Sequence, residues 1–175
     1  MANPADAPKF DVRYETGGDL PILVDHLYAT TIESGIYLSM ATLLPAKVEG
    51  REASVQATLF LPVSAIEALH TLTSEVRRHM GGGDPEMKGE VVTLRHDLPR
   101  SDVPALANFF NCNGTPDGLI LSVGRQSAGT PNLAVIFATY HMSMRTLLQL
   151  HWLVESLVGM IQRPKGYAEG PATRQ

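Results

Sequence analysis

The chain has 175 residues, of which 44% are hydrophobic and 18% are charged, a composition typical of a folded globular protein. Its single cysteine excludes a disulfide framework, and its net charge of −4 argues against a dedicated nucleic-acid or anionic-membrane surface. The first residues lack the pattern of a signal peptide, and no apolar run approaches the roughly 18 residues that span a bilayer. We therefore expect a cytoplasmic protein without membrane insertion.

The chain opens with a polar segment, and a strand of clear period follows. Residues 1–20 are rich in proline, glycine and aspartate, and we expect an N-terminal arm with one short strand at 10–14. Residues 21–80 form the first of two predicted repeats. In it, apolar residues alternate with polar ones over 53–61, which is typical of a strand with one solvated face.

A helix is predicted directly after this strand. Ser64 followed by Glu67 matches a capping box, and apolar residues then recur at helical spacing as far as Met80. Residues 81–106 are predicted to be a Gly-rich linker, with a possible short edge strand at 90–95.

The second predicted repeat, 107–162, has the same plan with more apolar side chains. Residues 133–140 are almost continuously apolar, as in a strand covered on both faces. The helix predicted at 142–162 is apolar around most of its circumference. It is either the centre of the chain's own core or an interface with another chain. The residues predicted for that interface are Trp152, Leu153 and Leu157. The tail, 163–175, has no packing pattern and is predicted to be disordered.

Internal similarity is the most informative feature of the sequence. Residues 24–39 align with 107–122, so that Asp25 falls on Asn108. In the helices, the apolar positions align with Ile66 on Met144. The alignment predicts an α+β fold of two pseudo-symmetric strand-strand-strand-helix repeats. Their antiparallel strands would form one sheet or two facing sheets, with the helices packed on one side.

Residues that carry chemistry are few and scattered. Cys112 has no base near it in the sequence, and it aligns with Ala29, so we expect a packing role rather than a nucleophile. His151 and Glu155 are four residues apart and share a helix face, but no third ligand lies at a diagnostic interval. We expect no catalytic residue, no cofactor and no metal site.

The second repeat also resembles a known family. Its sequence runs from Ala107-Asn108-Phe109 through Gly118-Leu119-Ile120-Leu121 to a strand and a helix that starts at Met142-Ser143. This pattern resembles the small bacterial family catalogued as domain of unknown function 3467. The first repeat resembles a diverged copy, at Val24-Asp25 and at 61–64. The resemblance covers about two-thirds of the chain and implies a tandem arrangement, hence a fused homodimer. It implies no reaction, cofactor or catalytic residue.

Together these patterns favour a noncatalytic protein-binding or assembly module of a bacterial or phage complex. It would act as a homo-oligomer or as a subunit of a larger assembly. Its sheet edges and second helix would be the contact surfaces. One alternative is a small acidic chaperone of the secretion or assembly type, which would hold clients on apolar patches. Another is an enzyme or small-ligand binder whose pocket lies between the repeats and uses Cys112, His141 or His151.

Overall fold

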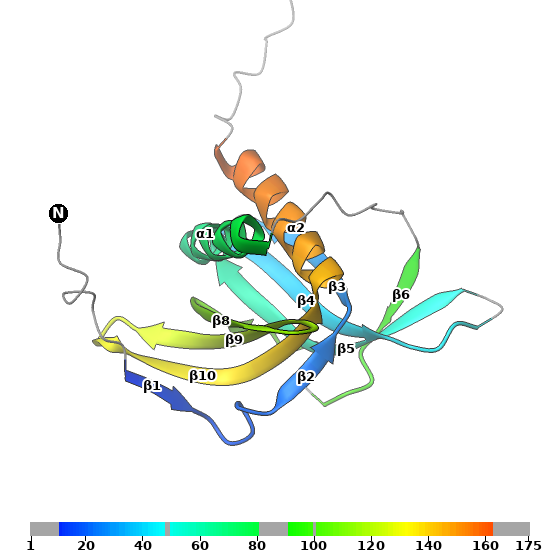
Figure 1. The fold of residues 1–175 in the computed structure, drawn as a ribbon, viewed down its shortest axis with the longest axis horizontal. Helices are drawn as coiled ribbons and strands as arrows, with labels where there is room; N and C mark the ends of the chain where they lie inside the picture. Colours follow the sequence, from blue (N-terminus) through cyan, green and yellow to red (C-terminus); the bar gives the residue numbers. More distant parts are fainter. Residues whose placement is uncertain (1–10, 48–49, 81–90, 100, 163–175) are drawn as a thin grey trace, which may run out of the picture.

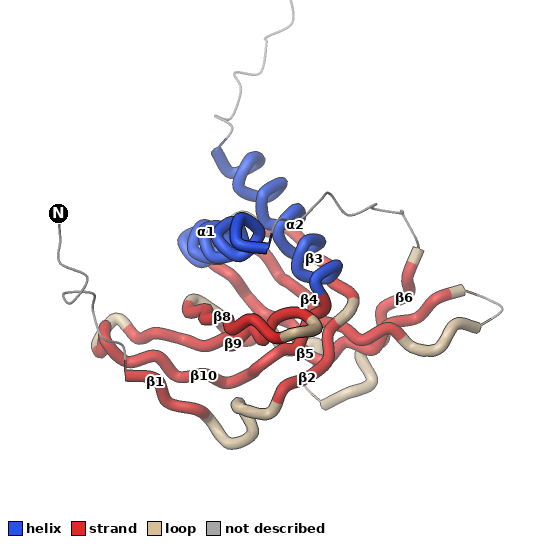
Figure 2. The backbone as a smooth tube through the Cα atoms, viewed as in Figure 1, coloured by secondary structure: helices blue, strands red, loops and turns tan. Residues whose placement is uncertain are grey.

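The computed structural model describes residues 11–47, 50–80, 91–99 and 101–162. They form an α+β fold in which two helices lie together on one side of two five-stranded sheets (Figure 1). Figure 2 shows the strand layer below and the helix pair above it. The predicted fold class and the placement of both helices on one side are confirmed. The predicted tail, 163–175, lies outside the described residues.

The first sheet is an antiparallel meander that leads into a helix. These elements are β3 (His26–Ile32), β4 (Gly35–Leu43), β5 (Arg51–Pro62) and α1 (Val63–Met80). Two short strands then add to the free side of β5 in parallel orientation, β6 (Val92–Arg95) and β7 (Ala105–Leu106). Parallel neighbours need a crossover connection, and α1 lies in the connection between β5 and β6.

The second sheet repeats this order of elements. Its meander and helix are β8 (Phe109–Thr115), β9 (Gly118–Ser127), β10 (Thr130–Ser143) and α2 (Met144–Gln162). Its two parallel edge strands pair with β10 and come from the start of the chain, β1 (Asp11–Tyr14) and β2 (Pro21–Val24). The short strands predicted at 10–14 and 90–95 are therefore present, as β1 and β6.

The short edge strands are exchanged between the two sheets. β1 and β2 precede β3 in the chain, yet they pair with β10 of the second sheet. Likewise β6 and β7 precede β8, yet they pair with β5 of the first sheet. The predicted N-terminal arm and linker thus contribute strands, and the sheets are mixed rather than purely antiparallel. The sequence pattern missed this because β7 has only two residues and an edge strand needs no strict alternation.

Two junctions use the same local hydrogen bond in both halves. Asp25, between β2 and β3, accepts a hydrogen bond from the backbone N–H of Leu43 at 2.6 Å. Asn108, between β7 and β8, accepts one from the backbone N–H of Gln126 at 2.7 Å. Asp25 and Asn108 are the pair that the sequence alignment matched. In each half this bond holds the chain where it passes from one sheet to the other.

The register of the helices differs from the sequence alignment. In the sheets Gly35 lies opposite Pro62, and Gly118 lies opposite Ser143. The first residues of α1 and α2 therefore correspond, so Ile66 matches Leu147 rather than Met144. Apolar residues on a helix face recur every three to four positions. A shift of three residues therefore preserves most of the apolar matches, which explains the error.

The helices also start differently from the expectation. α1 begins at Val63, one residue before Ser64, and no hydrogen bond of the Ser64 side chain occurs among the described residues, so the predicted capping box is wrong. α2 has the side-chain cap instead, because Ser143 Oγ accepts a hydrogen bond from the backbone N–H of Thr146 at 3.2 Å. The residue that corresponds to Ser143 is Pro62, which has no side-chain acceptor.

One hydrophobic core runs through both halves. Each helix packs against the other helix and also against the first strand of the other half, α1 on β8 and α2 on β3. A single cluster of buried side chains includes Ile36, Leu38, Met40, Leu59, Leu61, Ile66 and Leu69 from the first half and Leu121, Tyr140, Met142, Leu147 and Leu150 from the second. The two halves therefore share their core rather than forming independent domains.

Candidate functional site: two exposed sheet edges

The predicted interface on α2 is only partly at the surface. Leu157 is 4% exposed and belongs to the shared core. Trp152 is half-buried, and the Arg77 guanidinium lies 5.0 Å from the centre of its ring, a cation–π contact. Leu153 is half-buried and lines a surface cleft. The face of α2 around these three residues is thus largely used by contacts within the chain.

A buried polar cluster lies where α1 and α2 meet. His151 Nδ1 is 3.2 Å from Thr73 Oγ1, and its Nε2 is 3.3 Å from the Arg77 guanidinium. Because arginine can only donate, Nε2 accepts and Nδ1 carries the proton that it gives to Thr73. Glu155 Oε2 lies 3.7 Å from Nε2, so the predicted helix-face pair is present. The His70 ring stacks on the His151 ring, with centres 5.7 Å apart.

The environment of this cluster favours neutral His151. Burial lowers the pKa of His151; Glu155 opposes this, whereas Arg77 and His70 reinforce it. The ring is therefore a neutral hydrogen-bonding group at pH 7. Its contacts join the two helices, which is a structural role.

The remaining predicted residues lie apart from one another. Cys112 is half-buried on β8, and burial, followed by the charge of Glu75, raises the pKa of its thiol, so the thiol stays protonated at neutral pH. His141 is half-exposed on β10, opposite Ile120. Within the described ranges, no group of three or more potential metal ligands gathers.

Exposed apolar side chains gather along the two exchanged edges. Nine of the twelve large apolar side chains that are exposed in the described part of the chain lie on them. The β1–β2 edge carries Val12, Tyr14, Leu20, Ile22 and Leu23; the β6–β7 edge, with its flanking residues, carries Val91, Leu98, Val103 and Leu106. The exposed apolar residues of the described part are therefore concentrated along the two edges and the segments that flank them.

The two edges present apolar side chains at corresponding positions. Leu23 on β2 and Leu106 on β7 are 52% and 44% exposed, and the residue after each is fully buried. Because side chains alternate along a strand, Leu23 and Leu106 point away from the core. In register, Leu23 lies beside His141 and Leu106 lies beside Phe60. Each edge therefore continues the outer face of its sheet.

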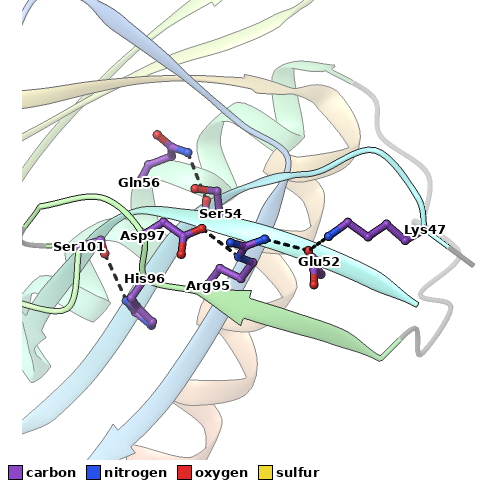
Figure 3. A network of polar contacts seen from close by, with 8 residues as sticks. All are labelled: Lys47, Glu52, Ser54, Gln56, Arg95, His96, Asp97 and Ser101. Atoms are coloured by element: carbon purple, nitrogen blue, oxygen red, sulfur yellow. Dashed lines mark hydrogen bonds and ion pairs between the residues drawn. The ribbon is translucent and has the colours of Figure 1, made fainter. Parts of the chain in front are cut away.

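Polar contacts fix both edges in place. On the β6–β7 edge, Glu52 accepts hydrogen bonds from Lys47 at 2.9 Å and from Arg95 at 3.2 Å, while Arg95 also pairs with Asp97 at 2.9 Å (Figure 3). The bonds from Lys47 and then Arg95 lower the pKa of the Glu52 carboxyl. On the other edge, Glu15 pairs with Arg125 of β9. These ion pairs are solvated, so they orient the edge strands more than they stabilise the fold.

The sequence predicts sheet edges as contact surfaces, but none of the residues on these two edges was singled out. The signal was present, since the match of Val24 with Ala107 extends backwards to Leu23 with Leu106 and to Leu20 with Val103. Leu20 falls in the predicted arm, Val103 and Leu106 fall in the predicted linker, and Leu23 falls at the start of the predicted first repeat, where no periodic pattern marks them.

Fold and surface thus define an α+β protein with a shared core, two mixed sheets and an apolar edge on each. No protein-family model, curated protein or solved structure matches the chain. Neither helix in the described part is both long and apolar enough to cross a membrane.

Proposed function

We propose that the protein is a noncatalytic protein-binding or assembly module that acts as an oligomer through its exchanged edges. The observation that carries the proposal is the pair Leu23 and Leu106, exposed apolar side chains at corresponding positions of the two edges. Edge strands offer unpaired backbone groups to another chain, and apolar side chains beside them supply affinity. Two matching edges on one chain are what such a role requires.

The proposal includes the origin of the two halves. The matched order of elements and the matched junction residues Asp25 and Asn108 support an internal repeat, that is, a fused homodimer of the kind that the resemblance to domain of unknown function 3467 implies. A bacterial or phage complex is the setting that we propose from this resemblance, and the cytoplasm remains the location expected from the sequence pattern. A surface that is present twice on one chain favours symmetric contacts, so a second copy of the chain is the first partner to test.

The test compares variants of the edges with a matched control. Leu23→Asp and Leu106→Asp, singly and together, place a charge on each edge without touching the core. Met160→Asp changes an exposed apolar residue on α2 instead. Light scattering coupled to size exclusion measures the mass of each protein, and thermal unfolding checks that each is folded. We expect the wild type and Met160→Asp to be oligomeric and the double variant to be monomeric.

Two results would contradict the proposal. A wild type that is monomeric at all accessible concentrations would exclude self-association through the edges. A folded double variant that keeps the wild-type mass would place the contact elsewhere, and Leu153→Asp would then test the α2 face. The intact mass of the complex purified from native cells would reveal partners other than a second copy. Such a partner supports the proposal only if the edge variants, purified in the same way, no longer bind it.

A further inference from the structure

We infer that the cleft between the first sheet and the start of α2 binds a small organic anion with an apolar body. The cleft has a volume of about 500 Å³, which is within the range of small-molecule sites. Its walls come from both halves of the chain, since residues of β3, β4, β5 and β6 face residues of α2. The lining residues that matter for recognition are His26, Leu27, Arg51, Arg145, Gln149 and Leu153.

Two arginines from separate elements line the cleft. Arg51 belongs to β5 and Arg145 to the first turn of α2, and both contribute to the lining. The carboxylate of Asp25, which also lines the cleft, accepts the backbone N–H of Leu43. The first turn of α2 contains no acidic residue. Guanidinium groups bind carboxylate and phosphate groups well, so the Arg145 side chain in the lining favours an anionic ligand.

The apolar part of the lining defines the rest of the ligand. Leu27, Leu43, Val92 and Leu153 line the same cleft as the two arginines. Small-molecule sites usually combine such apolar walls with a few polar groups that fix the orientation of the ligand. The matching ligand is therefore amphipathic, with one anionic group and an aliphatic or aromatic body.

The other half of the chain shows that the fold does not require these residues. By the sheet and helix register, His26 and Leu27 correspond to Phe109 and Phe110, and Arg145 corresponds to Ser64. Phe110 packs against the shared core. The same backbone structure is thus formed with two phenylalanines and an uncharged serine at the equivalent positions. Arg145 therefore has no cationic counterpart in the other half, so the fold itself does not require a cation at this position.

The experiment is an NMR titration of the full ¹⁵N-labelled chain. The probes are sodium octanoate and monooctyl phosphate, which distinguish the two anionic groups, and 1-octanol, which has the same body without charge. We expect at least one of the anions to shift the backbone amides of residues 26, 27, 92 and 145–149. The octanol should shift them less, because it cannot engage the guanidinium groups.

Two variants test whether Arg145 binds the anion and whether the ligand occupies the cleft. Arg145→Ser copies Ser64 of the other half and should weaken anion binding about tenfold, while Arg78→Ser, an exposed arginine on α1, should leave it unchanged. The double variant His26→Phe with Leu27→Phe copies Phe109 and Phe110 and should abolish binding by filling the cleft. The dispersion of the amide spectrum reports directly whether each variant is folded.

Three results would overturn the inference. The first is that neither anion shifts the cleft amides of the wild type at low millimolar concentration. The second is that octanol shifts these amides as strongly as both anions do. The third is that folded Arg145→Ser binds each anion as tightly as the wild type does. The oligomeric state of the edge variants is a separate measurement, so this site and the proposed function can fail independently.

Discussion

His151 shows how one residue joins the two halves of the molecule. Its ring is 3% exposed and uses both nitrogens toward α1, one to Thr73 and one to Arg77. By the helix register His151 corresponds to His70, the residue on which it stacks. The two histidines therefore meet where the corresponding faces of α1 and α2 pack against each other. Protonation would place a second cation beside Arg77.

We predict that this site makes stability depend on pH. The folded state lowers the pKa of His151 below its ordinary value of 6.5, so the unfolded chain binds more protons between the two pKa values. The stabilisation is complete well above pH 6.5 and is lost as the pH falls through 6.5 toward the folded pKa, by at most about 1.4 kcal/mol per pH unit. Urea unfolding between pH 5 and pH 8 measures it.

His151→Gln should remove this share of the pH dependence, because glutamine does not titrate. His79→Gln, at an exposed position in the last turn of α1, is the matched control and should retain it. An unchanged profile in folded His151→Gln would show that other groups cause the loss at acidic pH.

At the scale of elements, two glycines allow the second strand of each meander to start beside the end of the third. A Cβ atom on Gly35 would overlap the carbonyl oxygen of Leu61, and one on Gly118 would overlap that of Met142. Both contacts are with backbone, which cannot rotate away as a side chain does. These glycines therefore set where β4 and β9 begin, and the register follows from them.

We predict that Gly118→Ala lowers the free energy of unfolding by about 3 kcal/mol, because the added methyl group must displace β10. Gly114→Ala is the control on neighbouring β8, where a Cβ would meet nothing within 4 Å. It should leave stability unchanged or raise it by up to about 1 kcal/mol. Equal effects of the two substitutions in chemical denaturation would refute the steric explanation.

At the scale of the whole molecule, the exchanged strands and the shared core make the two halves interdependent. The first sheet lacks its outer strands without the segment that precedes β8, and the second sheet lacks its own without the start of the chain. Buried side chains of both halves touch in one cluster. Neither half can bury its apolar face alone.

The chain should therefore unfold in one cooperative transition. Far-ultraviolet circular dichroism, which reports all elements, and the fluorescence of Trp152 on α2, the single tryptophan, should give coincident curves. Calorimetric and van't Hoff enthalpies should agree. Two separated transitions would show that the halves fold as independent domains.

Local sequence patterns predicted most of the long strands and both helices. Strict alternation in β5, an apolar run in β10 and helical spacing in α1 and α2 predicted these elements, because burial leaves a direct trace in the order of residues. Residues 133–138 of β10 are buried or half-buried rather than fully covered on both faces. The alignment of Asp25 with Asn108 also matched residues that make the same hydrogen bond. The alignment of α1 with α2 was wrong by three residues, because the apolar spacing of a helix makes two registers nearly equivalent.

The sequence by itself determined the α+β class, the main strands and helices and the matching order of its two halves. Only the tertiary structure decided that the edge strands are exchanged, that the apolar residues of β2 and β7 face outward, and that Arg51 and Arg145 share a cleft. These features join residues far apart in the chain, and short edge strands obtain their order from a neighbouring strand rather than from their own pattern.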